Sequence, residues 1–180
     1  LTIEEENNVM TVSSPSPFGG GNLEIQVPTR TNLSLKSTNG GRVLVDGVEG
    51  DIEVTNVNGN VMLTNVSGSV VAHATNGRLT ASLKDVAPNK MMSFTSMNAN
   101  VDVTLPPTTK ANLKIRTDNG AAYSDFDIQL GPSSPPTVEK GTGGGTRIRT
   151  DGSINGTING GGPEFEIRTL NGNIYLRKAQ

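Results

Sequence analysis

The chain has 180 residues, of which 33% are hydrophobic and 3% aromatic, with 22 glycines and neither tryptophan nor cysteine. This size and composition suit one domain with a thin aliphatic core, and the lack of cysteine excludes disulfides, thiol catalysis and cysteine metal sites. A formal net charge of −2, with scattered Lys and Arg, argues against nucleic acid as a partner.

The first 40 residues alternate between polar loops and short apolar stretches. Residues 1–12 are expected to form one strand, interrupted by the acidic run Glu4–Asn8, which we interpret as a solvated edge. Residues 13–22 are rich in Ser, Pro and Gly and predict a loop. Leu23–Val27 alternates apolar and polar residues like a half-buried strand, which Pro28 ends.

Residues 41–83 contain five nine-residue units, each beginning with glycine. An internal repeat of fixed period decides the architecture before any single residue does. Apolar residues recur two and four positions after each glycine, which places them on one face of an extended strand. The residues at the first of these positions are Val43, Ile52, Val61, Val70 and Leu79.

A third apolar position, Val48, Val57 and Val66, lies an odd number of residues further along each unit. Because an odd step would point outward in a straight strand, each strand must bend to bring this position inward. The pattern therefore predicts an all-β, single-domain β-solenoid (β-helix-like array) over 1–180, with Asn-Gly or Gly corners. The sequence leaves two or three units per turn open. Two units would stack residues 18 apart, such as Asn58 and Asn76.

Later parts of the chain repeat the earlier ones. Val101–Pro106 resembles Leu23–Pro28, and Asn112–Gly120 resembles Asn32–Gly40. Ile167–Gly172 matches residues 115–120 a third time. Between these copies, the Pro-, Ser- and Gly-rich residues 131–145 predict a flexible excursion from the array.

Units such as Gly50–Asn58, and the closing stretch Gly162–Leu176, resemble a bacterial adhesin-like family of repeat domains of unknown function. The resemblance implies a β-solenoid of the cell envelope, with a glycan or an envelope protein as partner and no cofactor. No catalytic residues are attached to this family. Leu1 in place of Met is what we expect of an exported, trimmed precursor, and no stretch approaches the about 20 apolar residues of a membrane span.

Residues that could carry chemistry are few. His73 is the only histidine, and its predicted outward position lacks partners for a metal or a catalytic triad. Asp51 and Glu53 point to one outward face, which is the basis of an alternative function as a polysaccharide-active enzyme. No neighbouring unit adds acidic residues to this pair.

The first position after each glycine forms a predicted outward column, which we take as the candidate ligand-binding face. Its polar and charged side chains would meet an extended ligand such as a polysaccharide or a protein. The residues are Arg42, Asp51, Asn60, Ser69 and Arg78. The oligomeric state is left open by the sequence.

Overall fold

The computed structural model describes residues 1–14, 22–39, 41–131, 137–140, 146–149 and 153–180. The described residues are all-β. Among them there is no helix, and hence no helix long and apolar enough to cross a membrane. The predicted loop 13–22 and the excursion 131–145 fall largely outside them. The strands are β1 (Thr2–Glu6), β2 (Val9–Ser13), β3 (Leu33–Ser37), β4 (Val43–Asp46), β5 (Glu49–Asn56), β6 (Val61–Ala74), β7 (Leu79–Val86), β8 (Met92–Ser96), β9 (Val101–Leu105), β10 (Ala111–Asn119), β11 (Ala122–Ser124), β12 (Gln129–Leu130), β13 (Thr137–Lys140), β14 (Thr146–Arg149), β15 (Ile154–Ile158), β16 (Glu164–Asn171) and β17 (Ile174–Lys178).

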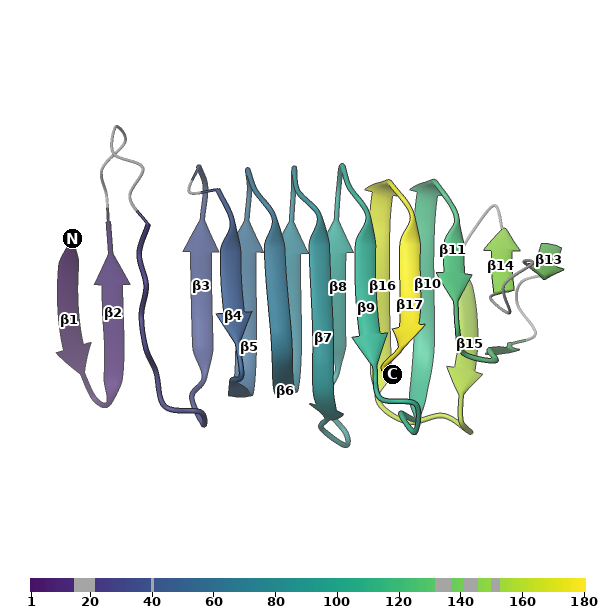
Figure 1. The fold of residues 1–180 in the computed structure, drawn as a ribbon, viewed down its shortest axis with the longest axis horizontal. Coiled ribbons are helices and arrows are strands. Elements are labelled where there is room, and N and C mark those ends of the chain that lie inside the picture. The colour runs from purple at the N-terminus through teal and green to yellow at the C-terminus, as the bar shows by residue number, and fades with distance from the viewer. Residues whose placement is uncertain (15–21, 40, 132–136, 141–145, 150–152) are drawn as a thin grey trace.

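One large mixed sheet contains every strand from β3 onward and curls into two facing walls (Figure 1). The curl occurs at β6, because its first residues pair with β4 and β7 and its last residues pair with β5 and β8. A strand of one wall, a corner and a strand of the other wall make a layer. In spatial order the layers are A (33–46), B (49–64), C (67–86), D (92–105), E (164–178) and F (111–124).

The offset between layers B and C is the predicted one. Ile52 pairs with Val70, and Val61 pairs with Leu79, both in parallel register. Nδ2 of Asn76 donates to Oδ1 of Asn58, 18 residues away. Two nine-residue units therefore make one layer in this part of the chain.

The spatial order of the layers departs from the chain order at the C-terminal end. Layer E, made of β16 and β17, lies between layer D and layer F in parallel register with both. Figure 1 shows these yellow strands between the green ones. The chain thus passes from layer D directly to layer F and fills the place between them last.

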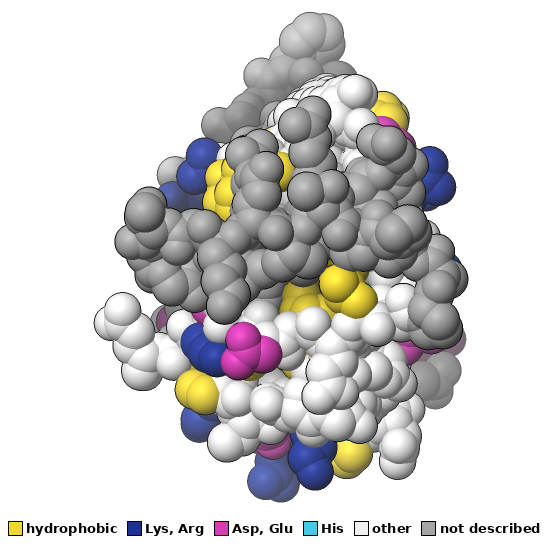
Figure 2. All heavy atoms as spheres, turned by 90° about the vertical axis from the view of Figure 1, so that its right-hand side faces the viewer, with side chains coloured by type: hydrophobic (Ala, Val, Ile, Leu, Met, Phe, Trp, Pro, Cys, Tyr) yellow, Lys and Arg dark blue, Asp and Glu magenta, His cyan; other side chains and the backbone are white. Residues whose placement is uncertain are grey.

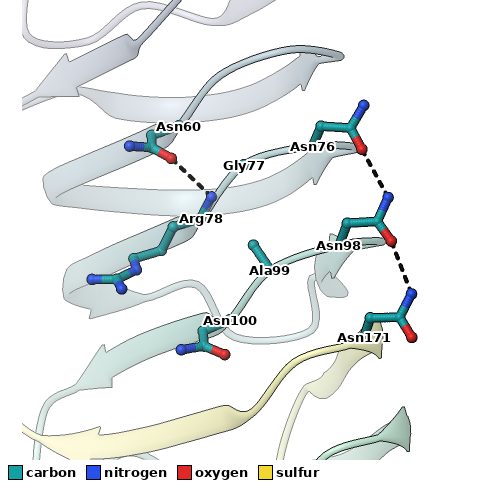
Figure 3. A pocket seen from close by; sticks show the side chains of 8 residues that line it. All are labelled: Asn60, Asn76, Gly77, Arg78, Asn98, Ala99, Asn100 and Asn171. Carbon is teal, nitrogen blue, oxygen red and sulfur yellow. Dashed lines mark hydrogen bonds between the residues drawn. The ribbon is translucent and has the colours of Figure 1, made fainter.

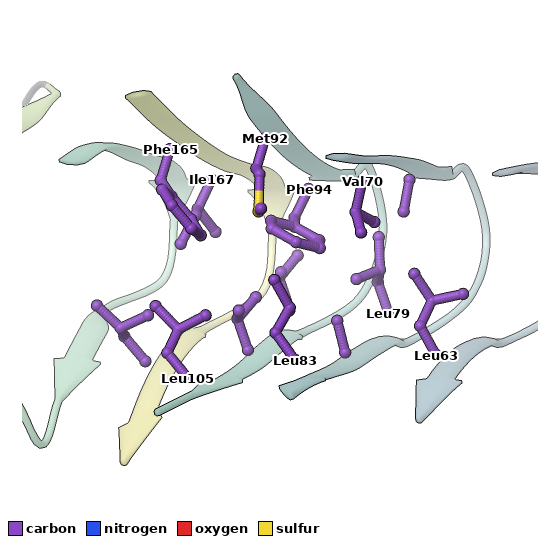
Figure 4. Close-up of a cluster of buried hydrophobic side chains, with 14 of the residues drawn as sticks. Leu63, Val70, Leu79, Leu83, Met92, Phe94, Leu105, Phe165 and Ile167 are labelled. Atoms are coloured by element: carbon purple, nitrogen blue, oxygen red, sulfur yellow. The ribbon is translucent and has the colours of Figure 1, made fainter. Parts of the chain in front are cut away.

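The core lies between the walls and consists of aliphatic side chains with a few larger ones (Figure 4). Phe94 of β8 and Phe165 of β16 are both fully buried, with ring centroids 6.5 Å apart. Burial of each of these two side chains stabilises the fold by roughly 1.5–3 kcal/mol. The contact between the two phenylalanines joins layers D and E.

The predicted inward position of Val57 is wrong, while that of Val48 and Val66 is confirmed. Gly47 and Asn65 have φ of +67° and +54°. This left-handed residue shifts the alternation by one position, so that the valine after it points inward, as does the apolar residue two positions before it. At the other corner the alternation continues unbroken. Asn56 is consequently fully buried and Val57 is only half-buried.

The N-terminal region also differs from its prediction. Residues 1–12 form a hairpin, β1 and β2, in a separate two-stranded sheet rather than one interrupted strand. Asn7 and Asn8 have φ of +52° and +62°, as a tight two-residue hairpin turn requires. Leu23–Val27 is not a strand, because no described segment forms a backbone ladder with it.

Candidate functional site

A shallow groove runs along the corner between the two walls, across layers B to E (Figure 3). Amide side chains line both of its sides, and backbone forms its floor. Arg78 is the one charged residue among those that line it. The lining residues of this amide groove are Asn60, Asn76, Gly77, Arg78, Asn98, Ala99, Asn100 and Asn171.

One side of the groove belongs to a ladder of asparagines that continues through all six layers. Each Nδ2 donates to the Oδ1 of the preceding layer over 2.7–3.0 Å. Layer E joins the ladder between layers D and F, since Asn171 donates to Asn98 and Asn119 donates to Asn171. In spatial order the ladder is Asn39, Asn58, Asn76, Asn98, Asn171 and Asn119.

The opposite side of the groove uses asparagine in another way. Oδ1 of Asn60 accepts the backbone N–H of Arg78 over 2.9 Å, and Oδ1 of Asn100 accepts that of Asn173 over 2.8 Å. These side chains fix the corner of the next layer. The guanidinium of Arg78 extends from this side of the groove (Figure 3).

The groove floor is narrow because successive corners approach each other closely. A Cβ atom on Gly77 would lie 1.9 Å from the carbonyl oxygen of Gly59. A Cβ atom on Gly172 would lie 2.4 Å from the carbonyl oxygen of Ala99. Glycine is required at both positions, and the groove between the asparagines therefore stays open.

Buried polar side chains stabilise the corner carbonyls from inside. Oγ1 of Thr169 donates to the carbonyl of Ala99 over 2.9 Å, and Oγ1 of Thr117 donates to that of Gly172 over 2.8 Å. Ser96 and Asn56 make the corresponding bonds to Gly77 and Gly41 at 3.2 and 2.8 Å. Such bonds satisfy carbonyl groups that would otherwise be buried without a partner.

Ala74 occupies this same inward column in layer C, where it pairs with Asn56 and Ser96, and offers no donor. Replacement of Ala74 by serine would place a hydroxyl beside the Gly59 carbonyl. We expect Ala74→Ser to raise the free energy of unfolding by about 1 kcal/mol. Urea denaturation measures the change, and Ala72→Ser, which lacks a corner carbonyl, is the control and is expected to be destabilising.

The predicted binding column is divided by the fold. Asn60 and Arg78 lie together at the groove, with Arg42 at the corresponding corner of layer A. Asp51 and Ser69 pair with each other on the other wall. Two units make one layer, so alternate members of the column fall on opposite walls. Of the predicted column, Asn60 and Arg78 line the groove, and the lining residues Asn98, Asn100 and Asn171 were not predicted.

The residues considered for catalysis sit on a flat outer wall. Asp51 and Glu53 are exposed on one face of β5, as predicted, and Asp51 forms an ion pair with Lys90. His73 stands next to Thr55 and Thr95 in the neighbouring strands β5 and β8. Among the described residues no group of three or more His, Asp or Glu side chains could hold a metal ion.

Charged side chains are scattered rather than gathered by sign. Figure 2 shows this on the end of the molecule that it faces, where basic and acidic side chains are interspersed on the coloured part of the surface. Arg177 of layer E pairs with Asp102 of layer D, and their hydrogen bond of 2.9 Å raises the pKa of the guanidinium.

Comparisons with protein-family models, with curated proteins and with solved structures found no match to this chain. The amide groove is therefore interpreted from its own geometry.

Proposed function

We propose that this chain is a single β-solenoid domain that serves as a non-enzymatic, adhesin-like or scaffold module of the bacterial cell envelope, outside the cytoplasm. The constant offset of 18 residues between layers B and C supports the solenoid architecture. The amide groove supports a role in binding, and it is the observation that carries the proposal.

The ladder leaves half of its hydrogen-bonding capacity free for a ligand. An asparagine amide has two N–H donors and two acceptor lone pairs, and a ladder contact uses one of each. Each rung, such as Asn76 or Asn98, can therefore offer one donor and one acceptor to the groove. Adjacent rungs repeat about every 4.8 Å, which is the spacing of neighbouring strands.

This regular array of donors and acceptors fits an extended polymer with repeating hydroxyl groups, and we propose a glycan as the ligand. Arg78 would add a charged donor at one point of the groove. The alternative of a polysaccharide-active enzyme gains no support from Asp51 and Glu53. Neither lines the amide groove, and Lys90 already neutralises Asp51.

A glycan array tests the proposal, with heat-denatured protein as the blank. We expect binding to a defined class of linear saccharide and a loss of about tenfold in affinity for Arg78→Ala, which removes a charged hydrogen-bond donor. The control is Arg116→Ala, because Arg116 lies on the outer face of β10, away from the groove, and pairs with Asp118.

A blank array with folded protein would contradict the glycan as ligand. Equal losses for the Arg78 and Arg116 variants would contradict the groove as the site. Capture of an envelope protein with the same dependence on Arg78 would replace the glycan by a protein partner.

A further inference from the structure

The internal repeat has a structural consequence at the N-terminal end of the sheet. Residues 23–39 and 101–119 share one pattern: an alternating stretch that ends in proline, a short link and an Asn-led strand that ends in Asn-Gly. In the second copy the link after Pro106 crosses from layer D to layer F, and layer E fills the place between them. The pattern is therefore a frame that accepts one additional layer.

In the first copy, the corresponding place between residues 23–27 and layer A is taken by no described segment. β3 pairs only with β5 and β4 only with β6, so one edge of each strand lacks a ladder among the described residues. Apolar side chains of this frame are correspondingly exposed. Leu23, Ile25 and Val27 are 56%, 47% and 37% exposed, whereas their counterparts in β9 are fully buried.

Charge also matches between the two frames. Glu24 stands at the position of Asp102, which binds the guanidinium of Arg177 from layer E with two hydrogen bonds of 2.9 and 3.0 Å. The first frame thus offers a carboxylate for a basic residue on an inserted layer. A layer with the composition of layer E meets both the apolar and the acidic requirement.

Layer E follows a turn that connects it to β15. Asn159, Gly160 and Gly161 in this turn have φ values of +50°, +85° and +85°, and Nδ2 of Asn159 donates to the carbonyls of Pro107 and Thr109. In its own copy layer E pairs with layers D and F, and exchange would replace these contacts by contacts with β3, β4 and residues 23–27.

We propose that the unpaired edges of β3 and β4, together with residues 23–27, bind layer E of a second copy of this chain. Insertion would add a parallel strand to both walls and cover Leu23, Ile25 and Val27. The donor and acceptor surfaces are different, so the exchange joins copies head to tail, in open chains or closed rings. Oligomers longer than dimers follow at high protein concentration.

Cysteine crosslinking tests this directly, since the chain has no cysteine of its own. Thr104 pairs with Arg177 within one copy, and Gln26 stands at the position of Thr104 in the first frame. A mixture of Q26C and R177C chains is expected to form about tenfold more interchain disulfide than a mixture of K84C and R177C, because docking raises the effective concentration of the thiols. The single chain T104C/R177C is the control for geometry and should close an internal disulfide.

Three outcomes would overturn the proposal. One is equal crosslinking of Q26C and K84C chains while T104C/R177C closes its disulfide. Another is a single monomeric species of the unaltered chain at all concentrations in sedimentation. The last is capture by Q26C of a synthetic peptide of residues 162–180 carrying R177C but not of the full chain, which would assign the edge to a layer from another protein.

Discussion

Replacement of Gly59 by valine is expected to lower the free energy of unfolding by more than about 4 kcal/mol or to prevent folding. A Cβ atom on Gly59 would lie 1.7 Å from the carbonyl oxygen of Gly41, which belongs to the backbone of the preceding layer and cannot move aside. Its φ of +157° adds strain that a β-branched residue tolerates poorly. Urea denaturation of the purified variant measures the loss.

Alanine at two glycines separates close approach from backbone strain. Gly47 has a φ of +67° but no atom within 4 Å of an added Cβ, so Gly47→Ala is expected to cost only about 1–2 kcal/mol. Gly59→Ala meets the same carbonyl as valine does and should cost clearly more. Equal losses for the two alanine variants would contradict the packing of successive corners described above.

The parts of the fold that follow from a period could be predicted from the sequence. Of the two arrangements that the nine-residue repeat left open, two units per turn places Ile52 beside Val70 and Asn58 beside Asn76, as the structure has them. The step of the amide ladder from Asn58 to Asn76 follows from the same period, whereas the neighbouring steps span 19 and 22 residues. Its extension through Asn171 was not predicted, since Asn171 is remote in sequence.

The order of the layers could not be predicted. The similarity of residues 167–172 to residues 115–120 was visible, but it shows only that both can occupy equivalent layers. Every layer presents similar apolar columns and the same asparagine to its neighbours. The local sequence pattern therefore does not determine which layers are neighbours.

The candidate site was predicted in part, for a geometrical reason. Asn60 and Arg78 belong to alternate units and remain together at one corner, whereas Asp51 falls on the opposite wall. Asn56 is buried in place of Val57 also because of the geometry of a corner. Which corners contain a left-handed residue, such as Asn65, decides where the alternation is reset.

Replacement of Ile167 by aspartate is expected to lower the free energy of unfolding by about 3–5 kcal/mol. Ile167 is fully buried and pairs with Phe94 of layer D and Ile115 of layer F. An unpaired carboxylate at this position would stand in the apolar core between two layers. The destabilisation should therefore reach beyond the strand that carries the substitution.

Hydrogen exchange distinguishes this layer order from one that follows the chain. If layer E joins layer D to layer F, Ile167→Asp should lower amide protection in 164–178 and in 111–124 together, while β5 and β6 keep theirs. The control is Arg168→Ala, which removes an exposed side chain of the same strand and should change neither. Loss of protection confined to residues 164–178 would place layer F directly against layer D. Layer E would then be a peripheral addition rather than the link through which residues 111–124 are attached to the remainder of the sheet.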